Sequence, residues 1–262
     1  MRDLLLATAI TTLLFAIFLV STEIGFRIGA KSPDKDRPGI GVIEGAVFGL
    51  FGLLLAFSFG TGIAHLDQRR QLIVNEANAI GVAYRRVDLL PAADQIEMRR
   101  LFLRYVDARL AVYQKVEILE VSQKSFDAAE ALQNPIWQIA MRAFRGPSRP
   151  QVTLLLVPAL NDMFDLEAER KAAISLHNPA LVFVLLIGVG LMTCVLGGYA
   201  LSARGWRSWL HGSVYALTLA LTIYTVIDLD NPRFGLIRLD AADKMLIDLR
   251  DTMQADEGGV YR

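Results

Sequence analysis

Two adjoining stretches decide the fold: residues 40–66, IGVIEGAVFGLFGLLLAFSFGTGIAHL, and residues 67–86, DQRRQLIVNEANAIGVAYRR. The first contains one acidic residue, Glu44, and is long enough to cross the hydrocarbon core of a bilayer as a helix. The second is polar, but its apolar residues recur at spacings of three, four and seven, which is typical of a helix with one packed face. No proline interrupts either stretch. The sequence therefore predicts one helix that crosses the membrane and continues into water.

Three further segments are predicted to span the membrane, at residues 4–20, 179–201 and 209–227. The first carries an Arg near its start, as a signal peptide does, but no small-x-small cleavage site follows it, so we expect a retained helix. The whole chain has a mean hydropathy of +0.39 and is still 21% charged. This combination indicates both lipid-facing and water-facing parts.

The segment between the second and third predicted spans is rich in Arg, Glu, Asp and Gln and is too polar to enter lipid. It shows no period-2 strand pattern, and prolines such as Pro135 are expected to separate shorter helices. We therefore predict an all-α membrane protein with a helical extramembrane domain inserted between spans 2 and 3. The predicted divisions are transmembrane helices 1 and 2 in residues 1–66, the helical domain in residues 67–178, transmembrane helices 3 and 4 in residues 179–227, and a C-terminal tail in residues 228–262.

Composition argues against several classes of function. The chain has 27 Lys and Arg residues against 27 Asp and Glu residues, so its net charge of zero does not favour nucleic acid as a partner. Cys194 is the only cysteine, which rules out an intramolecular disulfide and a multi-cysteine metal site. The nucleophile-elbow, Walker and zinc-protease motifs are missing from the sequence. We therefore expect no enzyme, no catalytic residues, no metal and no cofactor.

The second predicted span carries a stripe of small residues together with several aromatic residues. The small residues are Gly41, Gly45, Gly49, Gly52, Ala56 and Gly60. Such a stripe is typical of close helix packing; alternatively, it lines the axis of an assembly in which aromatic side chains form a hydrophobic constriction. The candidate pore or constriction residues are Glu44, Phe48, Phe51, Phe57 and Ser58. A monomeric bundle would use the same aromatic side chains as core.

Glu44 is the one acidic residue inside a predicted span, where a carboxylate is costly unless it is paired or hydrated. One interpretation is a structural ion pair with Arg27 or with another cation of the loop that precedes the span. The other interpretation is a residue of an ion pathway or a proton relay.

The fourth predicted span carries a single polar stripe. Its residues are His211, Tyr215, Thr218, Thr222 and Thr225, at spacings of four, three, four and three. Threonine hydroxyls in membrane helices commonly bond back to their own helix, which favours a packing role. As the wall of a pore, the stripe would instead offer hydroxyl donors without fixed charge, a chemistry that suits an anion.

Two acidic residues, Asp228 and Asp230, follow the fourth span directly and alternate with apolar residues. Their oxygens form a possible site for a hard cation such as Ca²⁺, although the spacing of an EF-hand is absent. Alternatively, the two acids pair with Arg69, Arg70 or Arg233 at the membrane surface and fix the tail against the helix that continues the second span.

Five stretches of this sequence resemble the bacterial bestrophin-like domain proteins, a family of unassigned function. The stretches are residues 53–59, LLLAFSF; residues 67–86, quoted above; residues 89–91, LLP; residues 105–109, YVDAR; and residues 228–238, DLDNPRFGLIR. The family name implies kinship to the bestrophins, which are pentameric anion channels with four spans per subunit, cytosolic termini and an aromatic-lined neck on the second span. Bestrophins follow that neck with an Arg and an aromatic residue, whereas this chain has HLDQRR at residues 65–70.

The resemblance also decides the expected orientation, because the Lys and Arg residues near the ends of the spans are almost equally divided between the two sides. It implies a bacterial plasma (inner) membrane, with the helical domain and both termini in the cytoplasm. We expect an oligomeric bestrophin-like pore whose partners are the lipid bilayer, further copies of itself and chloride or another small anion. The alternative is a non-conducting membrane-anchored assembly or regulatory protein whose helical domain binds a partner. A third hypothesis is a transporter that uses Glu44.

Overall fold

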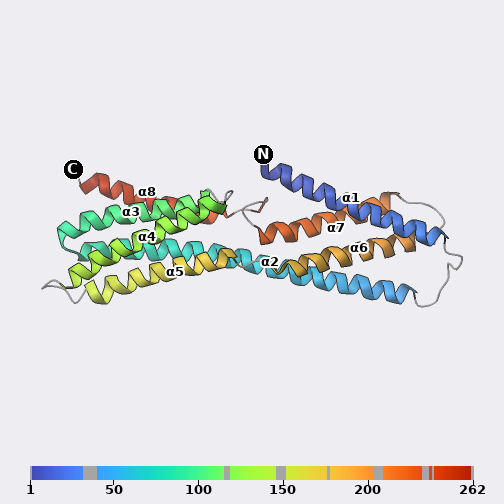
Figure 1. The fold of residues 1–262 in the computed structure, drawn as a ribbon, viewed down its shortest axis with the longest axis horizontal. Coiled ribbons are helices and arrows are strands. Elements are labelled where there is room, and N and C mark those ends of the chain that lie inside the picture. Colours follow the sequence, from blue (N-terminus) through green and yellow to red (C-terminus); the bar gives the residue numbers. More distant parts are fainter. Residues whose placement is uncertain are drawn as a thin grey trace. The chain divides into compact units, whose positions relative to one another are not determined.

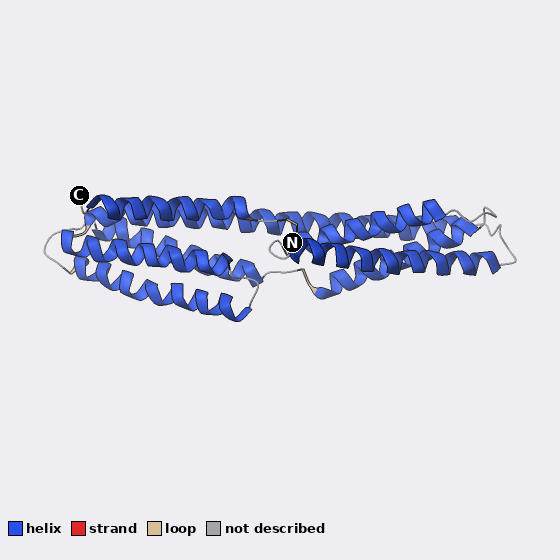
Figure 2. Ribbon diagram, turned by 90° about the horizontal axis from the view of Figure 1, so that it is seen from above, coloured by secondary structure: helices blue, strands red, loops and turns tan. Residues whose placement is uncertain are grey.

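The computed structural model describes residues 2–31, 40–114, 119–145, 152–175, 178–202, 209–231, 236–237 and 239–260. Within these ranges the regular elements are eight α-helices, one short 3₁₀ helix and one short π-helix, and no strand occurs among them. Figure 2, coloured by secondary structure, shows the same helical character along both halves of the chain. The predicted all-α class is confirmed.

Within the described part of the chain, four helices are long and apolar enough to cross a membrane, as predicted. They are α1 (Arg2–Lys31), α2 (Ile40–Arg85), α6 (Ala180–Ser202) and α7 (Trp209–Asp230). Within the chain they are covered unequally: 39% of the most apolar window of α7 is buried, but only 11% of that of α2. The remaining apolar side chains of α2 therefore need lipid or another protein surface around them.

The chain divides into two compact units. Unit 1 comprises Met1–Leu66 and His177–Ile237, and unit 2 comprises Asp67–Leu176 and Arg238–Arg262. The helix α2 contributes its first part to unit 1 and its second part to unit 2.

In unit 1, α1 packs against α6 and α7 (Figure 1). The contact between α1 and α6 is so close that only glycine fits. A Cβ atom at Gly25 would lie 1.9 Å from the carbonyl oxygen of Val195, and one at Gly198 would lie 2.0 Å from that of Thr22. These two helices therefore meet backbone to backbone, as small residues permit in membrane proteins.

The helix α1 also extends beyond the predicted end of the first span, at residue 20, as far as Lys31. The added turns include an ion pair at helical spacing, in which Arg27 Nε donates to Glu23 Oε1 at 2.7 Å. Gly29 lies in the same turns and faces Ser202 of α6. Close packing against α6 and the local ion pair account for the extra length.

Unit 2 contains the second part of α2 together with α3 (Ala92–Gln114), α4 (Leu119–Phe144), α5 (Val157–Ser175) and α8 (Asp240–Val260). The 3₁₀ helix η1 (Arg86–Leu89) and the π-helix η2 (Val152–Leu156) belong to the same unit. The predicted apolar stripe of α2 is buried, which confirms the packed face. Its buried residues in this unit are Ile73, Ala77, Ile80 and Tyr84 on α2, and Val87 continues the stripe on η1.

One expectation about the helical domain was wrong. Pro135 does not separate two helices, because α4 continues through it from Leu119 to Phe144. Proline cannot donate a hydrogen bond to the carbonyl of Ala131, four residues earlier. Ala131 is exposed, so water can satisfy that carbonyl, and the helix can continue.

Candidate functional site

The small-residue face of α2 is open within the chain. A Cβ atom added to Gly41, Gly45, Gly49, Gly52 or Gly60 would meet no atom of the described residues within 4 Å. Gly25 and Gly29 of α1 and Gly198 of α6 contrast with this face, since a Cβ atom at each of them would overlap atoms of the neighbouring helix. The close packing inside unit 1 thus uses α1 and α6, and the described residues of the chain leave the small-residue face of α2 uncovered.

The aromatic candidates of α2 fall into different environments. Phe51 is only 5% exposed and packs into the apolar cluster of unit 1. Phe48 contacts Tyr215 of α7 edge to face, with ring centroids 6.2 Å apart. Phe57 is 67% exposed. Ser58 is buried and donates its hydroxyl to the carbonyl of Leu54 at 2.8 Å. Phe57 is therefore the aromatic candidate whose side chain points outside the chain.

Glu44 is half-buried, and its Oε1 atom has no hydrogen-bond partner among the described residues. Arg27, one of its expected partners, instead donates to Glu23 on α1. A carboxylate in a membrane helix is costly without a partner or water. Among the described residues this carboxylate oxygen therefore has no donor, and residues 32–39 of the preceding loop, where further cations were expected as partners, lie outside the described part of the chain.

The polar stripe of α7 is largely engaged by its own helix. Thr218 donates to the carbonyl of Val214 at 2.9 Å, Thr222 to that of Thr218 at 2.7 Å, and Thr225 to that of Leu221 at 2.8 Å. The remaining two stripe residues differ: His211 is exposed, and Tyr215 is half-buried against Phe48. The threonine protons would have to turn away from their carbonyls before they could bind an anion.

Asp228 holds the chain that follows α7 through backbone groups. Its Oδ1 and Oδ2 accept the N–H of Leu236 at 3.1 and 3.0 Å, and Oδ2 also accepts the N–H of Ile237 at 3.0 Å. The carboxylate is buried, so these bonds are made away from bulk water. The sequence analysis considered only side-chain cations as partners, because a sequence does not show which backbone N–H groups lie near a carboxylate.

Asp230 is also buried and accepts the backbone N–H of Asn178, just before α6, at 3.0 Å. Nδ1 of His65 lies 3.9 Å from the same carboxylate. Within the described part of the chain, no group of three or more His, Cys, Asp or Glu residues is placed to hold a metal ion. The two acids thus act on the backbone around them.

Of the three cations expected beside these acids, two make contacts elsewhere and one lies outside the described residues. Arg69 Nε donates to the carbonyl of Ala173 at 3.4 Å. Arg70 pairs with Asp67 at 3.4 Å, and Arg233 lies outside the described residues.

Unit 2 contains a buried network of charges that sequence reasoning missed. Glu76 of α2 accepts from Arg109 Nε of α3 at 2.5 Å and also pairs with Arg170 of α5. Arg109 reaches Glu167 of α5 through a second nitrogen at 3.1 Å. None of these four side chains is more than 5% exposed. Two arginines and two glutamates balance, so the network is neutral, as buried charges must nearly be.

Neutral polar side chains complete this network. The hydroxyl of Tyr105 donates to Glu167 Oε2 at 2.8 Å, and the amide of Gln133 on α4 donates to the same oxygen. Burial, followed by the nearby charge of Glu167, raises the pKa of Tyr105 well above its usual value of 10.0. The network thus joins α2, α3, α4 and α5 in one core.

A sequence signal for the network did exist. Glu76 falls between Ile73 and Ile80 on the predicted packed face of α2, at helical spacings of three and four. Arg109 stands likewise between Tyr105 and Val112 on α3. A charged residue on an apolar stripe indicates a buried partner, but the sequence did not show which charges meet.

Comparison with known proteins assigns the chain to a family. A family model described as bestrophin-like domain matches residues 12–242. No curated protein and no solved structure matches the chain. The match extends from α1 to the start of α8 and so includes the four apolar helices and the buried charge network. With four helices suited to a bilayer, the chain is an integral membrane protein, and it belongs to the bestrophin-like domain family.

Proposed function

We propose that the chain is one subunit of a homo-oligomeric membrane pore that conducts a small anion such as chloride. The pore lies in a bacterial plasma membrane, with the helical domain and the termini in the cytoplasm. The observation that carries the proposal is the open glycine face of α2, next to the exposed Phe57. The apolar part of α2 lies innermost and faces the same helix of other subunits.

A glycine has no side chain to pack against lipid, but it lets the backbone of another helix approach closely. Five glycines on one open face therefore favour a protein surface over acyl chains. A pore built from one helix of each subunit needs a closed ring, and rings are the usual form of cyclic homo-oligomers. Membership of the bestrophin-like family supports the same arrangement.

The hydrophobic constriction is assigned to Phe57. Its side chain is free of the chain's own core, whereas Phe51 is buried in that core and Phe48 leans on Tyr215. A ring of phenylalanines can exclude water from a narrow pore and so gate conduction. Selectivity for anions is supported by family kinship and by the scarcity of acids along the span, where Glu44 is the only one.

The test is anion flux through the purified protein in liposomes. We expect chloride flux above that of empty liposomes, and we expect Phe57→Ala to increase it by widening the constriction. Ile17→Ala is the control, because this apolar side chain is 40% exposed on α1 and lies outside the helix that the proposal places at the pore axis. An intact oligomer that passes no chloride under varied pH and calcium would contradict the pore.

The second candidate function is a non-conducting assembly or regulatory protein. It is favoured by unit 2, whose helices α3 and α4 leave an open groove that a partner can occupy. In that case the glycine face of α2 serves assembly alone, and Phe57→Ala changes no flux. The third hypothesis, a transporter that uses Glu44, predicts pH-dependent uptake that Glu44→Gln abolishes.

A further inference from the structure

The helices α2 and α7 lie side by side in unit 1 along one seam. At one place the rings of Phe48 and Tyr215 meet, with centroids 6.2 Å apart. At a second place a Cβ atom on Gly62 would lie 3.0 Å from the Cβ atom of Leu229. The two contacts are fourteen residues apart on each helix, so α2 and α7 run in the same direction and keep the same register between them. This line of contact is called the α2–α7 seam below.

The threonines of the α7 polar stripe lie along the seam. Tyr215 and Leu229, which contact α2, share one face of α7 with the threonines, because all five follow one another at spacings of three and four. The threonines are Thr218, Thr222 and Thr225. Each donates its proton to a carbonyl of its own helix, so its oxygen can still accept a hydrogen bond from water. Thr218 is exposed, so the rest of the described chain does not cover the stripe completely.

An acid and a histidine stand at each end of the seam. At one end, Glu44 of α2 and His211 of α7 each lie one turn before the contact between the two rings, and therefore at the same level. At the other end, Nδ1 of His65 lies 3.9 Å from Oδ1 of Asp230. Between Glu44 and His65, α2 rises by roughly 30 Å, which is the thickness of a hydrocarbon core.

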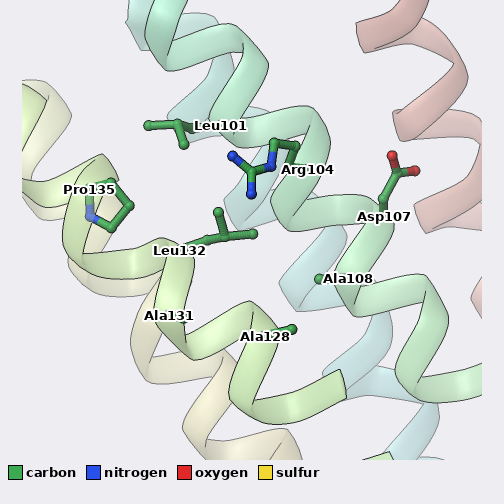
Figure 3. A pocket seen from close by; sticks show the side chains of 8 residues that line it. All are labelled: Leu101, Arg104, Asp107, Ala108, Ala128, Ala131, Leu132 and Pro135. Atoms are coloured by element: carbon green, nitrogen blue, oxygen red, sulfur yellow. The ribbon is translucent and has the colours of Figure 1, made fainter. Parts of the chain in front are cut away.

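Buried polar atoms without a protein partner occur along the seam. Among the described residues they include Glu44 Oε1, Tyr215 Oη and His65 Nδ1. Buried polar groups in native proteins are almost always hydrogen-bonded, either to protein or to ordered water, so water in the seam would satisfy these three atoms. The groove between α3 and α4 in unit 2 differs, because no such atom lines it and its charged residues, Arg104 and Asp107, are both exposed (Figure 3).

We propose that the α2–α7 seam of each subunit is a water-filled path that carries protons across the membrane. Chains of Asp, Glu and His inside membranes are typical of proton relays. A proton binds at the Glu44–His211 end, passes along water molecules that the hydroxyl groups hold in place, and leaves through His65 and Asp230, or travels in reverse. Each transfer breaks one O–H or N–H bond and forms another on the next acceptor, so the path needs only a proton gradient.

The spacing of the hydroxyl groups suits such a path. Stripe residues three or four apart are separated by roughly 5–6 Å along the helix axis. Two hydrogen bonds through one water molecule span about the same distance. The path lies within one subunit and carries no solute besides the proton. It therefore goes beyond both the anion pore between subunits and the transporter that uses Glu44.

Proton flux into liposomes that contain the purified full-length protein tests the path. A pH-sensitive dye inside the liposomes reports the flux in a chloride-free medium, and a potassium gradient with valinomycin drives it. We expect flux above that of empty liposomes and a loss of about tenfold in Glu44→Gln, whose amide cannot bind and release the proton. Glu44→Asp keeps a carboxyl group and should retain part of the flux. Glu23→Gln is the matched control, because this acid lies on α1 and pairs with Arg27.

Thiol labelling tests for water in the seam. Cys194→Ala first removes the only cysteine. In that background, Thr222→Cys in liposomes should react with a small charged methanethiosulfonate reagent, because the reactive thiolate forms in contact with water. Leu221→Cys is the matched control, since Leu221 is the next residue and is 49% exposed on a different face of α7. Lipid should slow the labelling of this control by about tenfold.

The outcomes separate this path from the proposed function. Chloride flux without proton flux overturns the path and leaves the pore standing. Proton flux that is the same in Glu44→Gln and Glu23→Gln, or equal labelling of the two cysteines, also overturns the path. Proton flux that is lost in Glu44→Gln and partly kept in Glu44→Asp, in liposomes that pass no chloride, supports the path and counts against the pore.

Discussion

The two parts of α2 show opposite arrangements within one helix. In unit 1, glycines and Phe57 are open, and the charged residue Glu44 has a carboxylate oxygen without a partner among the described residues. In unit 2, the apolar stripe is buried, and Glu76 is completely enclosed by two arginines. The difference shows what surrounds each part of the helix. The first part leaves its apolar surface for lipid or other subunits, whereas the second completes a core within the chain.

The largest effect is expected from breaking the enclosed part. Glu76→Leu removes the partner of Arg109 and Arg170 and leaves uncompensated positive charge in the core, which should cost about 3–5 kcal/mol of unfolding free energy. Chemical unfolding of the full chain in detergent measures this loss. The control is Glu169→Leu on the exposed face of α5, which should stay within about 0.5 kcal/mol of the parent. Equal stability of the two variants would show that the network contributes little.

A somewhat smaller effect is expected where α1 meets α6. Gly198→Ala places a methyl group against the carbonyl of Thr22, so the helices must separate at a cost of about 1–3 kcal/mol. Gly52→Ala adds the same group to the open face of α2 and is the matched control, with no clash inside the subunit. Thermal unfolding compares the two variants. A larger loss at Gly52 would mean that the face of α2 is the more tightly packed of the two.

The open face can be probed through assembly instead of subunit stability. Gly49→Leu should leave the fold of the subunit intact, because a Cβ atom at this position meets no described atom within 4 Å. It should still lower the oligomeric fraction, by about tenfold in association constant, because it blocks close approach between copies. Native mass measurement in mild detergent gives the fraction. Unchanged assembly would place lipid, and no second subunit, against this face.

The smallest effect concerns a hydroxyl in the buried network. Tyr105→Phe removes one bond to Glu167 and should cost about 1 kcal/mol at neutral pH. The pKa of Tyr105 is raised in the folded chain, so its contribution is present below its usual value of 10.0 and declines as the pH rises above that value. The unfolding free energy, followed from about pH 8 to about pH 11, should therefore fall less steeply in Tyr105→Phe than in the parent. Parallel curves would exclude a role for this tyrosine.

The sequence predicted the helical class and the four apolar helices, because the length and purity of an apolar run depend on the run alone. The packed face of α2 was predictable for a similar local reason. The extension of α1 to Lys31 was missed, although Gly25 and Gly29, at helical spacing, were a visible sign of a close helix contact. Pro135 was misread because the rule for proline ignores whether the freed carbonyl faces water.

For the candidate site, the sequence identified residues but not their environments. Phe48, Phe51 and Phe57 look equivalent in the chain, and only the packing of the other helices separates a buried ring from an exposed one. The pairing of Glu76 with Arg109 and Arg170 joins positions far apart in sequence, and no local pattern encodes such a match.

The hydrogen bonds that Asp228 accepts from the segment after α7 have a consequence for sequence variation. Its carboxylate recognises the main-chain N–H groups of Leu236 and Ile237, and every amino acid except proline carries that group. Leu236 is exposed, so other residues can replace it without loss of these hydrogen bonds, whereas a replacement of Asp228 would remove them. Among related sequences, we expect an acidic residue to be retained at position 228. Positions 236 and 237 should vary, except that proline should be absent from both.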